Sequence, residues 1–338
     1  MLEQELLEAA RGGDEDAYSR LIEPHRRELH AHCYRMLGSV HDAEDALQDA
    51  LLRAWRGLAG FEGRSSLRSW LYKIATNTCL DLIARRPKRV LPTDYGPAGD
   101  PHDQSEPPLL ESVWVEAYPD EALGLEDGFA APEARIERRE AVELAFIAAI
   151  QHLPPRQRAV LILRDVLGFS GREVAELLET TVGSVNGALH RARKAVEERL
   201  PDESQQATLR ELGDDRIREL VAAYLEAWER GDVEAVVAML LEDATIAMPP
   251  MALWYSGRDA IAVFLATQAL LKERWRFVPV RANGQLAFGT YNWDAEKGSY
   301  IASAVDVLTL RGAKVEAITA FVSPEIFRGF GLPDELPA

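Results

Sequence analysis

The chain has 338 residues, of which 47% are apolar and 28% are charged, so it can bury the cores of two or three domains and is not a disordered protein. No apolar run approaches the roughly 20 residues that span a membrane, and the acidic start lacks the layout of a signal peptide, so we expect a cytoplasmic protein without membrane contact. Two cysteines, Cys33 and Cys79, are too few for a disulfide framework and are expected to be buried thiols.

The net charge of −17 is distributed unevenly along the chain. Basic and acidic residues balance at 14 each in residues 1 to 90, and they number 8 and 7 in residues 141 to 199. Residues 91 to 140 hold 3 basic against 13 acidic residues, and residues 200 to 338 hold 13 against 21. Because nucleic-acid binding depends on a local basic patch, the acidic total does not exclude DNA as a partner.

Residues 1 to 90 have an almost wholly helical pattern, with breaks at Gly12-Gly13, Gly38-Ser39 and Gly57 to Ser66, and we expect one all-α domain here. Within it, the segment VHDAEDALQDALLRAWRGL places acids along one helix face. Such a stripe suits a basic partner surface, although composition alone favours an ordinary solvated face.

The next segment interleaves aromatic and basic side chains. Residues 61 to 66 are predicted to form a polar loop, and LRSWLYKIATNTCLDLIARRPKR a helix. Trp70 and Tyr72 of this helix are interleaved with Arg68 and Lys73, and Arg64 lies in the preceding loop. Such a surface can hold a single strand, since bases stack on rings while cations track phosphates. The alternative is that Trp70 belongs to the core and the terminal cations complement the helix dipole.

Residues 91 to 135 are rich in proline and acids, which predicts an extended linker. The apolar island SVWVEAY inside it indicates either a docking contact with a neighbouring domain or partner, or a local cluster over the nearest helix.

Residues 136 to 200 form a second helical domain that contains a helix-turn-helix over residues 170 to 199. Ser170 and Glu173 make a capping box, and Thr181 caps the second helix. In that helix one stripe is apolar, at Val182, Val185, Leu189, Ala192 and Val196. The other face is polar and basic, as a helix that enters the major groove requires. A plain amphipathic hairpin with a solvated face is the alternative.

After a connector over residues 201 to 213, residues 214 to 338 change to an α+β pattern. A helix with its apolar stripe ends at Gly231, and five predicted strands follow: TIAMPP, ERWRFVPV, QLAFGTYNW, YIASAVDVLTL and VEAITAFV. Asn283-Gly284 and Arg311-Gly312 are predicted hairpin turns, which makes a curved sheet wrapped over helices.

Two long patterns, DAEDALQDALLRAWRGLAGFEGRSSLRSWLYKIATNTCLD and LPPRQRAVLILRDVLGFSGREVAELLETTVGSVNGALHRARK, resemble domains 2 and 4 of an extracytoplasmic-function (group 4) sigma factor of the sigma-70 family. The resemblance implies that the acidic face binds the β′ clamp helices of core RNA polymerase, with the β flap as a further partner. Residues implied for core-polymerase binding are Asp42, Glu44, Asp45, Gln48 and Asp49.

The same resemblance assigns promoter contacts. Phe61 to Ser66 would cradle a flipped base of the −10 element, while Trp70 and Asn77 would support the melted junction. The full −10 set is Phe61, Arg64, Ser65, Ser66, Arg68, Trp70, Lys73, Asn77, Arg85 and Arg86. The −35 set is Thr181, Ser184, Asn186, His190, Arg191, Arg193 and Lys194. Gly187 and Ala188 stand where the family often has Ser-Arg, so −35 readout depends on the remaining polar residues. The acidic linker would thread the polymerase channel and imitate RNA.

In the last 125 or so residues, the segment YLEAWERGDVEAVVAMLLEDATIAMPP is followed by WYSGRDAIAVFL. These two segments resemble a SnoaL-like cone domain, the fold shared with ketosteroid isomerase. Candidates to line a pocket for a small apolar ligand are Met248, Trp254, Tyr255, Phe264, Trp275, Tyr291, Trp293 and Asp306, although aromatics at these spacings are more often core. Asp306 could be an isomerase-like base only if it faces the pocket. All seven histidines precede residue 191, so metal or triad chemistry is not expected in this domain.

The sequence therefore predicts a sigma initiation factor, not an enzyme, without a cofactor or a metal site, whose fused SnoaL-like domain regulates it by contacting the sigma domains. His30, His32 and Cys33 have helical spacings that point their side chains apart, so no metal is expected there. The alternatives are a stand-alone helix-turn-helix regulator, or an isomerase or cyclase tethered to a DNA-binding module.

Overall fold

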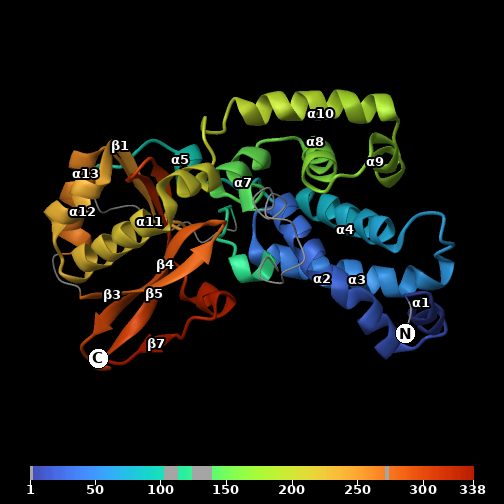
Figure 1. Cartoon of the computed structure of the whole chain (residues 1–338), viewed down its shortest axis with the longest axis horizontal. Coiled ribbons are helices and arrows are strands. Elements are labelled where there is room, and N and C mark those ends of the chain that lie inside the picture. Colours follow the sequence, from blue (N-terminus) through green and yellow to red (C-terminus); the bar gives the residue numbers. More distant parts are fainter. Residues whose placement is uncertain (1–2, 103–112, 124–138, 271–273) are drawn as a thin grey trace. The chain divides into compact units, whose positions relative to one another are not determined.

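The computed structural model describes residues 3 to 102, 113 to 123, 139 to 270 and 274 to 338 (Figure 1). It divides into two compact units. Unit 1 comprises Met1–Arg89, Ala122–Ala130 and Ala145–Leu200, and unit 2 comprises Val90–Glu121, Ala131–Leu144 and Pro201–Ala338. Within the described ranges, no helix has the length and apolar character needed to cross a membrane.

The first part of unit 1 is a helical bundle, drawn in blue in Figure 1. Its elements are α1 (Glu3–Arg11), α2 (Glu15–Leu37), α3 (Val40–Gly57), the 3₁₀ turn η1 (Leu58–Gly60) and α4 (Leu67–Ile83). Asp14, Ser39 and Ser66 cap the helix starts, each accepting from the N–H three residues on, and Gly38 ends α2 with a left-handed φ of 71°. The predicted helix breaks are confirmed, and Cys33 and Cys79 are buried thiols as expected.

The second part of unit 1 contains the helix-turn-helix. Its elements are α7 (Leu144–Gln151), α8 (Pro155–Leu161), the π-helical turn η3 (Ile162–Val166), α9 (Gly171–Leu177) and α10 (Val182–Glu197). Both hydrogen bonds of the Ser170–Glu173 capping box are present, and Thr181 caps α10. Helix α10 packs on α8 and α9 (Figure 1). One residue of the predicted stripe differs: Val182, the first residue of α10, is 45% exposed.

Unit 2 is built around one sheet, and the predicted α+β class is confirmed. Its helical elements are α5 (Pro92–Tyr95), η2 (Asp120–Leu123, of which the first two residues lie in this unit), α11 (Gln205–Glu229), α12 (Val233–Met239), α13 (Arg258–Phe264), the π-helical turn η4 (Leu265–Ala269) and η5 (Pro324–Phe330). The strands are β1 (Leu240–Ala247), β2 (Trp254–Ser256), β3 (Trp275–Ala282), β4 (Gln285–Asp294), β5 (Ser299–Arg311), β6 (Lys314–Phe321) and β7 (Glu335–Leu336).

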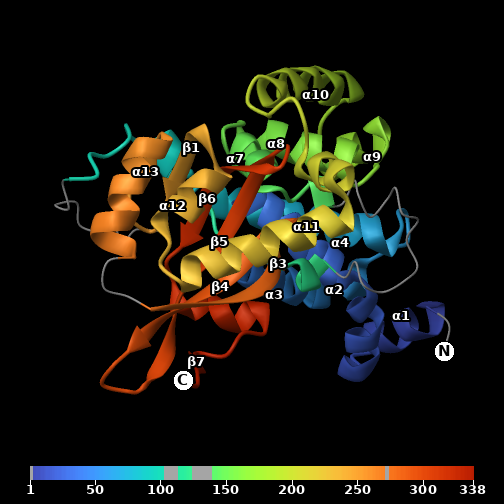
Figure 2. The same cartoon turned by 60° about the vertical axis from the view of Figure 1, so that its left-hand side comes forward.

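The sheet has the order β2-β1-β6-β5-β4-β3, with β7 paired to β5, and only the β1–β6 pair is parallel. Helix α11 lies across the strands (Figure 2), where Tyr224 stacks on Phe288 at a ring separation of 5.0 Å. The helix begins at Gln205, before the predicted start, because Ser204 caps it and Gly213 bends it with a φ of 71°. Strands β2 and β7 were not predicted, since two or three residues carry no readable alternation.

The described parts of the predicted linker are not a free tether, because they pack within unit 2. Val115 and Tyr118 are fully buried, and the ring of Trp114 lies 5.2 Å from that of Tyr95. The indole of Trp254 donates to the carbonyl of Gly96 at 2.9 Å. Apolar side chains of the acidic segment therefore anchor it, and the rest of the predicted linker lies outside the described residues.

The buried turn Asn283-Gly284, between β3 and β4, is the centre of this packing. The side-chain carbonyl of Asn283 accepts from the Tyr118 N–H at 2.8 Å, and its amide donates to the carbonyl of Val142 at 2.7 Å. The N–H of Gly284 donates to Asp120 Oδ1 at 2.7 Å. One hairpin tip thus holds two segments that come before and after the undescribed residues 124 to 138.

Glu143, next to Val142, is also held by buried hydrogen bonds. Its carboxylate accepts from the backbone N–H groups of Gln205 and Gln206 at 3.0 and 2.9 Å, so it caps the start of α11. Burial raises the pKa of Glu143 to about 7. The N–H of Leu144 donates to Gln285 Oε1 at 2.9 Å. This bond joins Leu144, the last residue of its segment in unit 2, to the start of β4.

Candidate nucleic-acid interface

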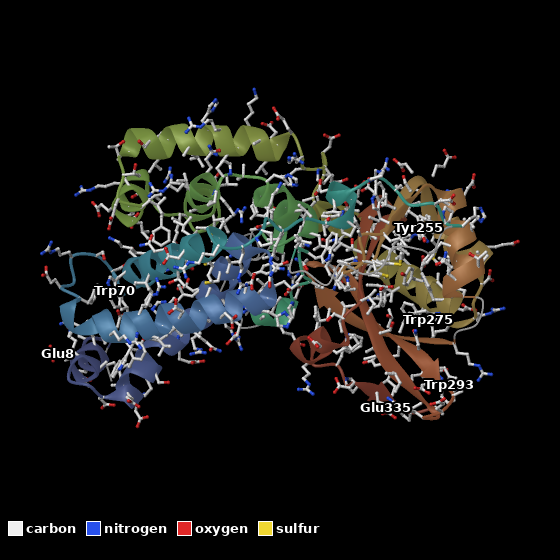
Figure 3. The ribbon with its side chains drawn as sticks, turned by 180° about the vertical axis from the view of Figure 1, so that it is seen from behind. Glu8, Trp70, Tyr255, Trp275, Trp293 and Glu335 are labelled. Atoms are coloured by element: carbon white, nitrogen blue, oxygen red, sulfur yellow. The ribbon has the colours of Figure 1, made fainter. Side chains whose placement is uncertain are left out.

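A groove of about 780 Å³ in unit 1 brings together six of the predicted −10 contacts. It is lined by Gly60, Phe61, Glu62, Arg64, Ser65, Ser66, Ser69, Trp70 and Lys73 on one side and by Glu173, Glu176 and Leu177 of α9 on the other. Trp70 is labelled in Figure 3, on α4 next to this loop. The sequence did not reveal the α9 wall, because those residues lie about 110 positions further along the chain.

The base of the groove is formed by packed aromatic rings, while its rim is exposed. The rings of Phe61 and Trp70 are 5.0 Å apart, and Phe61 is only 7% exposed. Gly63 turns the loop with a φ of 72°, which a residue with a Cβ rarely adopts. Arg64 and Ser65 are exposed, so this arrangement offers an aromatic platform beside hydroxyl and guanidinium donors.

Two predicted contacts are already engaged within unit 1. The guanidinium of Arg68 lies 4.9 Å from the ring centroids of both Tyr72 and Phe169, and its Nε donates to Glu28 Oε2 at 3.1 Å. Lys73 donates to Glu179 Oε1 at 2.8 Å. Arg68 is therefore turned away from the groove, and it joins α4 to the segment that precedes α9.

The remaining predicted −10 residues do not line the groove. Asn77 is exposed further along α4, and Arg85 is exposed beyond its end. Arg86 forms an ion pair with Asp42 and lines a different pocket. The structure thus separates a loop-and-α4 groove from the cationic tail of that helix.

The predicted −35 residues share one surface. Thr181, Ser184, Asn186, His190, Arg191, Arg193 and Lys194 are all exposed on α10 or at its start. Thr181 accepts from the N–H of Ser184 at 3.1 Å, and Arg193 binds both oxygens of Asp165 at 2.7 and 2.8 Å. Because the ion pair is exposed, Arg193 can exchange Asp165 for a phosphate at little cost.

Of the acidic face on α3, four residues are exposed: Glu44, Asp45, Gln48 and Asp49. Asp42 differs from the expectation, since its side chain is only 8% exposed and holds both Arg86 and Arg89. It secures the tail of α4, and helix spacing alone did not reveal that two arginines from that tail cover it.

The structure gives the eight cone-domain candidates different neighbours within unit 2. Met248, Tyr255 and Phe264 belong to the hydrophobic core, with Trp275 packed at its edge. Tyr291 packs on Phe327 and Trp293 on Tyr300. Figure 3 shows Trp293 near Glu335 of β7 and away from Tyr255, and Trp254 binds the docked segment. Each of these aromatic residues therefore has a packing or hydrogen-bond contact within unit 2.

Asp306 faces the core of the sheet, on the same side of β5 as Ala304 and Leu308. It is 5% exposed, and burial raises its pKa from 3.8 to about 7. The charge of Asp306 in turn contributes to raising the pKa of Tyr224, after burial itself. The structure thus places a carboxyl group in an apolar interior, where the neutral form is favoured.

Asp306 should make unit 2 less stable as the pH rises. Since the folded carboxyl keeps its proton up to about pH 7 while the unfolded one loses it near pH 3.8, stability falls between these values. Asp306→Asn removes this pH-dependent loss. The free energy of unfolding of the variant minus that of the wild type, measured in urea, should therefore increase by about 2–3 kcal/mol from pH 5 to pH 8. Asp243→Asn is the control, because Arg311 lowers the pKa of that exposed carboxyl. A constant difference across the range would contradict the assignment.

His30 and His32, where no metal was expected, contact polar side chains of unit 1. His32 is fully buried and shares a hydrogen bond with Thr76 Oγ1 at 2.9 Å, and burial lowers its pKa to about 3. His30 lies 3.6 Å from Glu44 Oε2. The described residues contain no group of three or more His, Cys, Asp or Glu side chains placed to hold a metal.

Three family models match the chain in the order of its predicted parts. Sigma-70 region 2 matches residues 21 to 89, Sigma-70, region 4 matches residues 143 to 196, and the SnoaL-like domain matches residues 221 to 318. The first contains the groove and the acidic face, and the second contains α10.

Known relatives extend over nearly the whole chain. The ECF RNA polymerase sigma factor SigG of Mycobacterium tuberculosis is 41% identical over 337 residues, which cover 96% of this chain and 86% of that protein. The ECF RNA polymerase sigma factor SigW of Bacillus subtilis is 28% identical over 202 residues, 60% of this chain and 98% of that protein. The solved structure of the Mycobacterium tuberculosis extracytoplasmic function sigma factor SigJ matches with a TM-score of 0.56 at 23% identity, covering 91% of this chain and 97% of that one, and supports the fold.

Proposed function

Since the chain belongs to the ECF RNA polymerase sigma factors of the sigma-70 family, we propose that the groove and the exposed face of α10 are its two promoter contacts. Members of this family are initiation factors and not enzymes. The groove at Trp70 receives an unpaired base of the −10 element, and α10 reads the −35 element. The observation that supports this most is the convergence of Phe61, Ser65, Ser66 and Trp70 around one groove.

The groove suits a base that has left the duplex. A flipped base needs an aromatic face and donors for its edge, which Trp70, Ser65 and Ser66 supply, while Arg64 is near enough to the rim to meet a phosphate. The volume of the groove is large enough for one flipped base.

The core-polymerase contact is the exposed part of the acidic face, Glu44, Asp45, Gln48 and Asp49. Three carboxylates and an amide on one helix complement a basic helical surface and speed its association. Asp42 is not included, because Arg86 and Arg89 already neutralise it.

Recognition of the −35 element depends on Ser184, Asn186, His190 and Arg191, which are exposed along α10. Asn can pair with adenine and Arg with guanine in the major groove. Gly187 and Ala188 add no donor, so specific duplex binding requires the second contact supplied through polymerase.

The α9 wall must move before a strand fills the groove. Glu173 and Glu176 line the groove, where they also accept from the Ser170 N–H and from Arg172, and Glu179 binds Lys73. The negative charges of this wall would face the backbone of an entering strand. Like charges facing a phosphate backbone weaken its binding. The free chain is therefore a poor DNA binder, and core polymerase selects the opened form.

Neutralising that wall should strengthen single-strand binding. We expect Glu173→Gln with Glu176→Gln to tighten binding of a −10-like oligonucleotide to the free chain about three- to tenfold, since each exposed charge contributes up to about 1 kcal/mol. Fluorescence anisotropy at fixed salt measures this effect. The control is Glu197→Gln with Glu198→Gln at the end of α10, which has the same change in net charge. Equal affinities in both variants would place the strand elsewhere.

The SnoaL-like domain regulates the sigma domains through the buried turn at Asn283. That turn binds residues 118 to 120 and residue 142, the two described ends of the segment between the sigma regions. Holding both ends fixes how far the connection can extend. A turn variant that leaves promoter-dependent transcription equal to wild type would count against this regulation.

Run-off transcription with purified core polymerase on genomic fragments tests the proposed function. Promoter-specific products that depend on the chain are expected, and substitution of Asn186 and Arg191 together should abolish them at promoters with a −35 element. A stand-alone regulator or an isomerase would give no product from any fragment.

A further inference from the structure

A second pocket in unit 1, of about 350 Å³, lies between the tail of α4 and the turn that joins α7 to α8. The charged and titratable side chains in its lining are Asp42, Arg86, Lys88, Arg89, His152 and Arg158. The promoter contacts proposed above do not use it. Its volume suits a small molecule rather than a polymer.

The lining is strongly cationic for a chain with a net charge of −17. Among the described lining residues, four are permanently positive and only one, Asp42, is a carboxylate. Asp42 is shared between Arg86 and Arg89. Lys88 Nζ and His152 Nδ1 are 2.6 Å apart, so the ammonium donates to a neutral imidazole. A cavity with low-dielectric walls concentrates such a positive field.

Arg158 adds a buried charge to this pocket. It is 4% exposed, and its guanidinium donates to neutral oxygens only, the carbonyls of Met36, Gln151 and Leu153 and the side chain of Gln151. Its Nε has no hydrogen-bond partner. Burial lowers the pKa of Arg158 to about 10. A buried cation without a carboxylate is costly, and an anion in the pocket would lower that cost.

We propose that this pocket binds a small phosphorylated anion that bridges the α4 tail and the α7–α8 turn. Arginine guanidiniums match phosphate oxygens in geometry, and the lysine supplies a compact charge beside them. Because the two walls come from the regions matched by sigma-70 region 2 and region 4, a bound anion stabilises their packed arrangement. The ligand thereby opposes the opening that promoter binding requires, a consequence that depends on the proposed function.

The test is titration of the full chain with pyrophosphate and with inorganic phosphate, each against sodium chloride of equal ionic strength. We expect saturable binding of one equivalent by calorimetry and a concentration-dependent rise in melting temperature. Lys88→Gln, at an exposed position, should weaken affinity at least tenfold, while Lys297→Gln on an exposed turn of unit 2 should not. Circular dichroism checks that both variants fold.

The proposal would be overturned by no saturable binding beyond the chloride control, or by equal affinity of Lys88→Gln and Lys297→Gln for pyrophosphate. It would also be overturned if a short duplex DNA, at equal phosphate concentration, displaced pyrophosphate, because the pocket would then bind a DNA backbone and not a small anion. Run-off transcription separates this from the proposed function. A chain that binds pyrophosphate but yields no transcript contradicts the proposed promoter contacts alone. A chain that transcribes without binding pyrophosphate contradicts the anion site alone.

Discussion

Replacing Asn283 with alanine is expected to lower the free energy of unfolding of unit 2 by about 3–5 kcal/mol. The substitution removes the side-chain bonds to Tyr118 and Val142 and leaves a buried N–H and a buried carbonyl without partners. Each such group costs about 1–3 kcal/mol. Alanine also tolerates the φ of 55° poorly, which adds about 1 kcal/mol.

Hydrogen exchange in the native state measures this effect where it arises. The amides of Tyr118 and Gly284 should exchange faster in Asn283→Ala, while amides in α10 keep their protection. Asn283→Gly retains the backbone conformation and isolates the side-chain contribution. Gly312→Ala, at a hairpin turn with a φ of 57° and open space around it, isolates the strain. If Asn283→Ala loses no more stability than Gly312→Ala, the turn does not hold the two segments.

The same turn marks the limit of sequence reasoning here. Asn-Gly between alternating strands is a strong local hairpin signal, and the structure confirms the turn. A local signal carries no information about what packs on the hairpin, and hairpin tips are ordinarily solvated. The full burial of Asn283 was therefore not predictable, because its partners Tyr118 and Val142 lie more than 140 residues away.

Helix caps were the most reliable part of the prediction. Ser170, Glu173 and Thr181 act within three residues, so the sequence contains their complete hydrogen bonds. Asp42 is the opposite case, since its helix phase predicted a solvent-facing carboxylate while Arg89, 47 residues later, covers it. Placing charged residues on a face requires the tertiary neighbours, and periodicity supplies only the phase.

Among the predicted groove residues, some were placed correctly from the local pattern and one was not. The alternation of rings and cations identified Arg64 and Trp70, and the family resemblance added Phe61; all three line one groove. Arg68 belongs to the same alternating pattern, but its guanidinium lies over the rings of Tyr72 and Phe169. Arg68 lies away from the groove because its guanidinium packs on Phe169, about 100 residues away, and local spacing could not identify that partner.

Trp70→Ala should reduce promoter opening about 10- to 100-fold, the largest functional effect expected of a single substitution. Stacking of a base on an aromatic side chain contributes about 1–3 kcal/mol, and loss of the indole also removes the ring that supports Phe61 at 5.0 Å. Permanganate reactivity of unpaired thymines in the −10 element, with core polymerase present, measures opening directly. Trp70→Phe keeps a stacking face and should lose less than tenfold. Affinity for core polymerase should not change, because Asp45, Gln48 and Asp49 lie on α3 and do not line the groove. A folded Trp70→Ala chain that opens the promoter within twofold of wild type would assign Trp70 to the core, since loss of a base contact must slow melting while loss of packing alone need not.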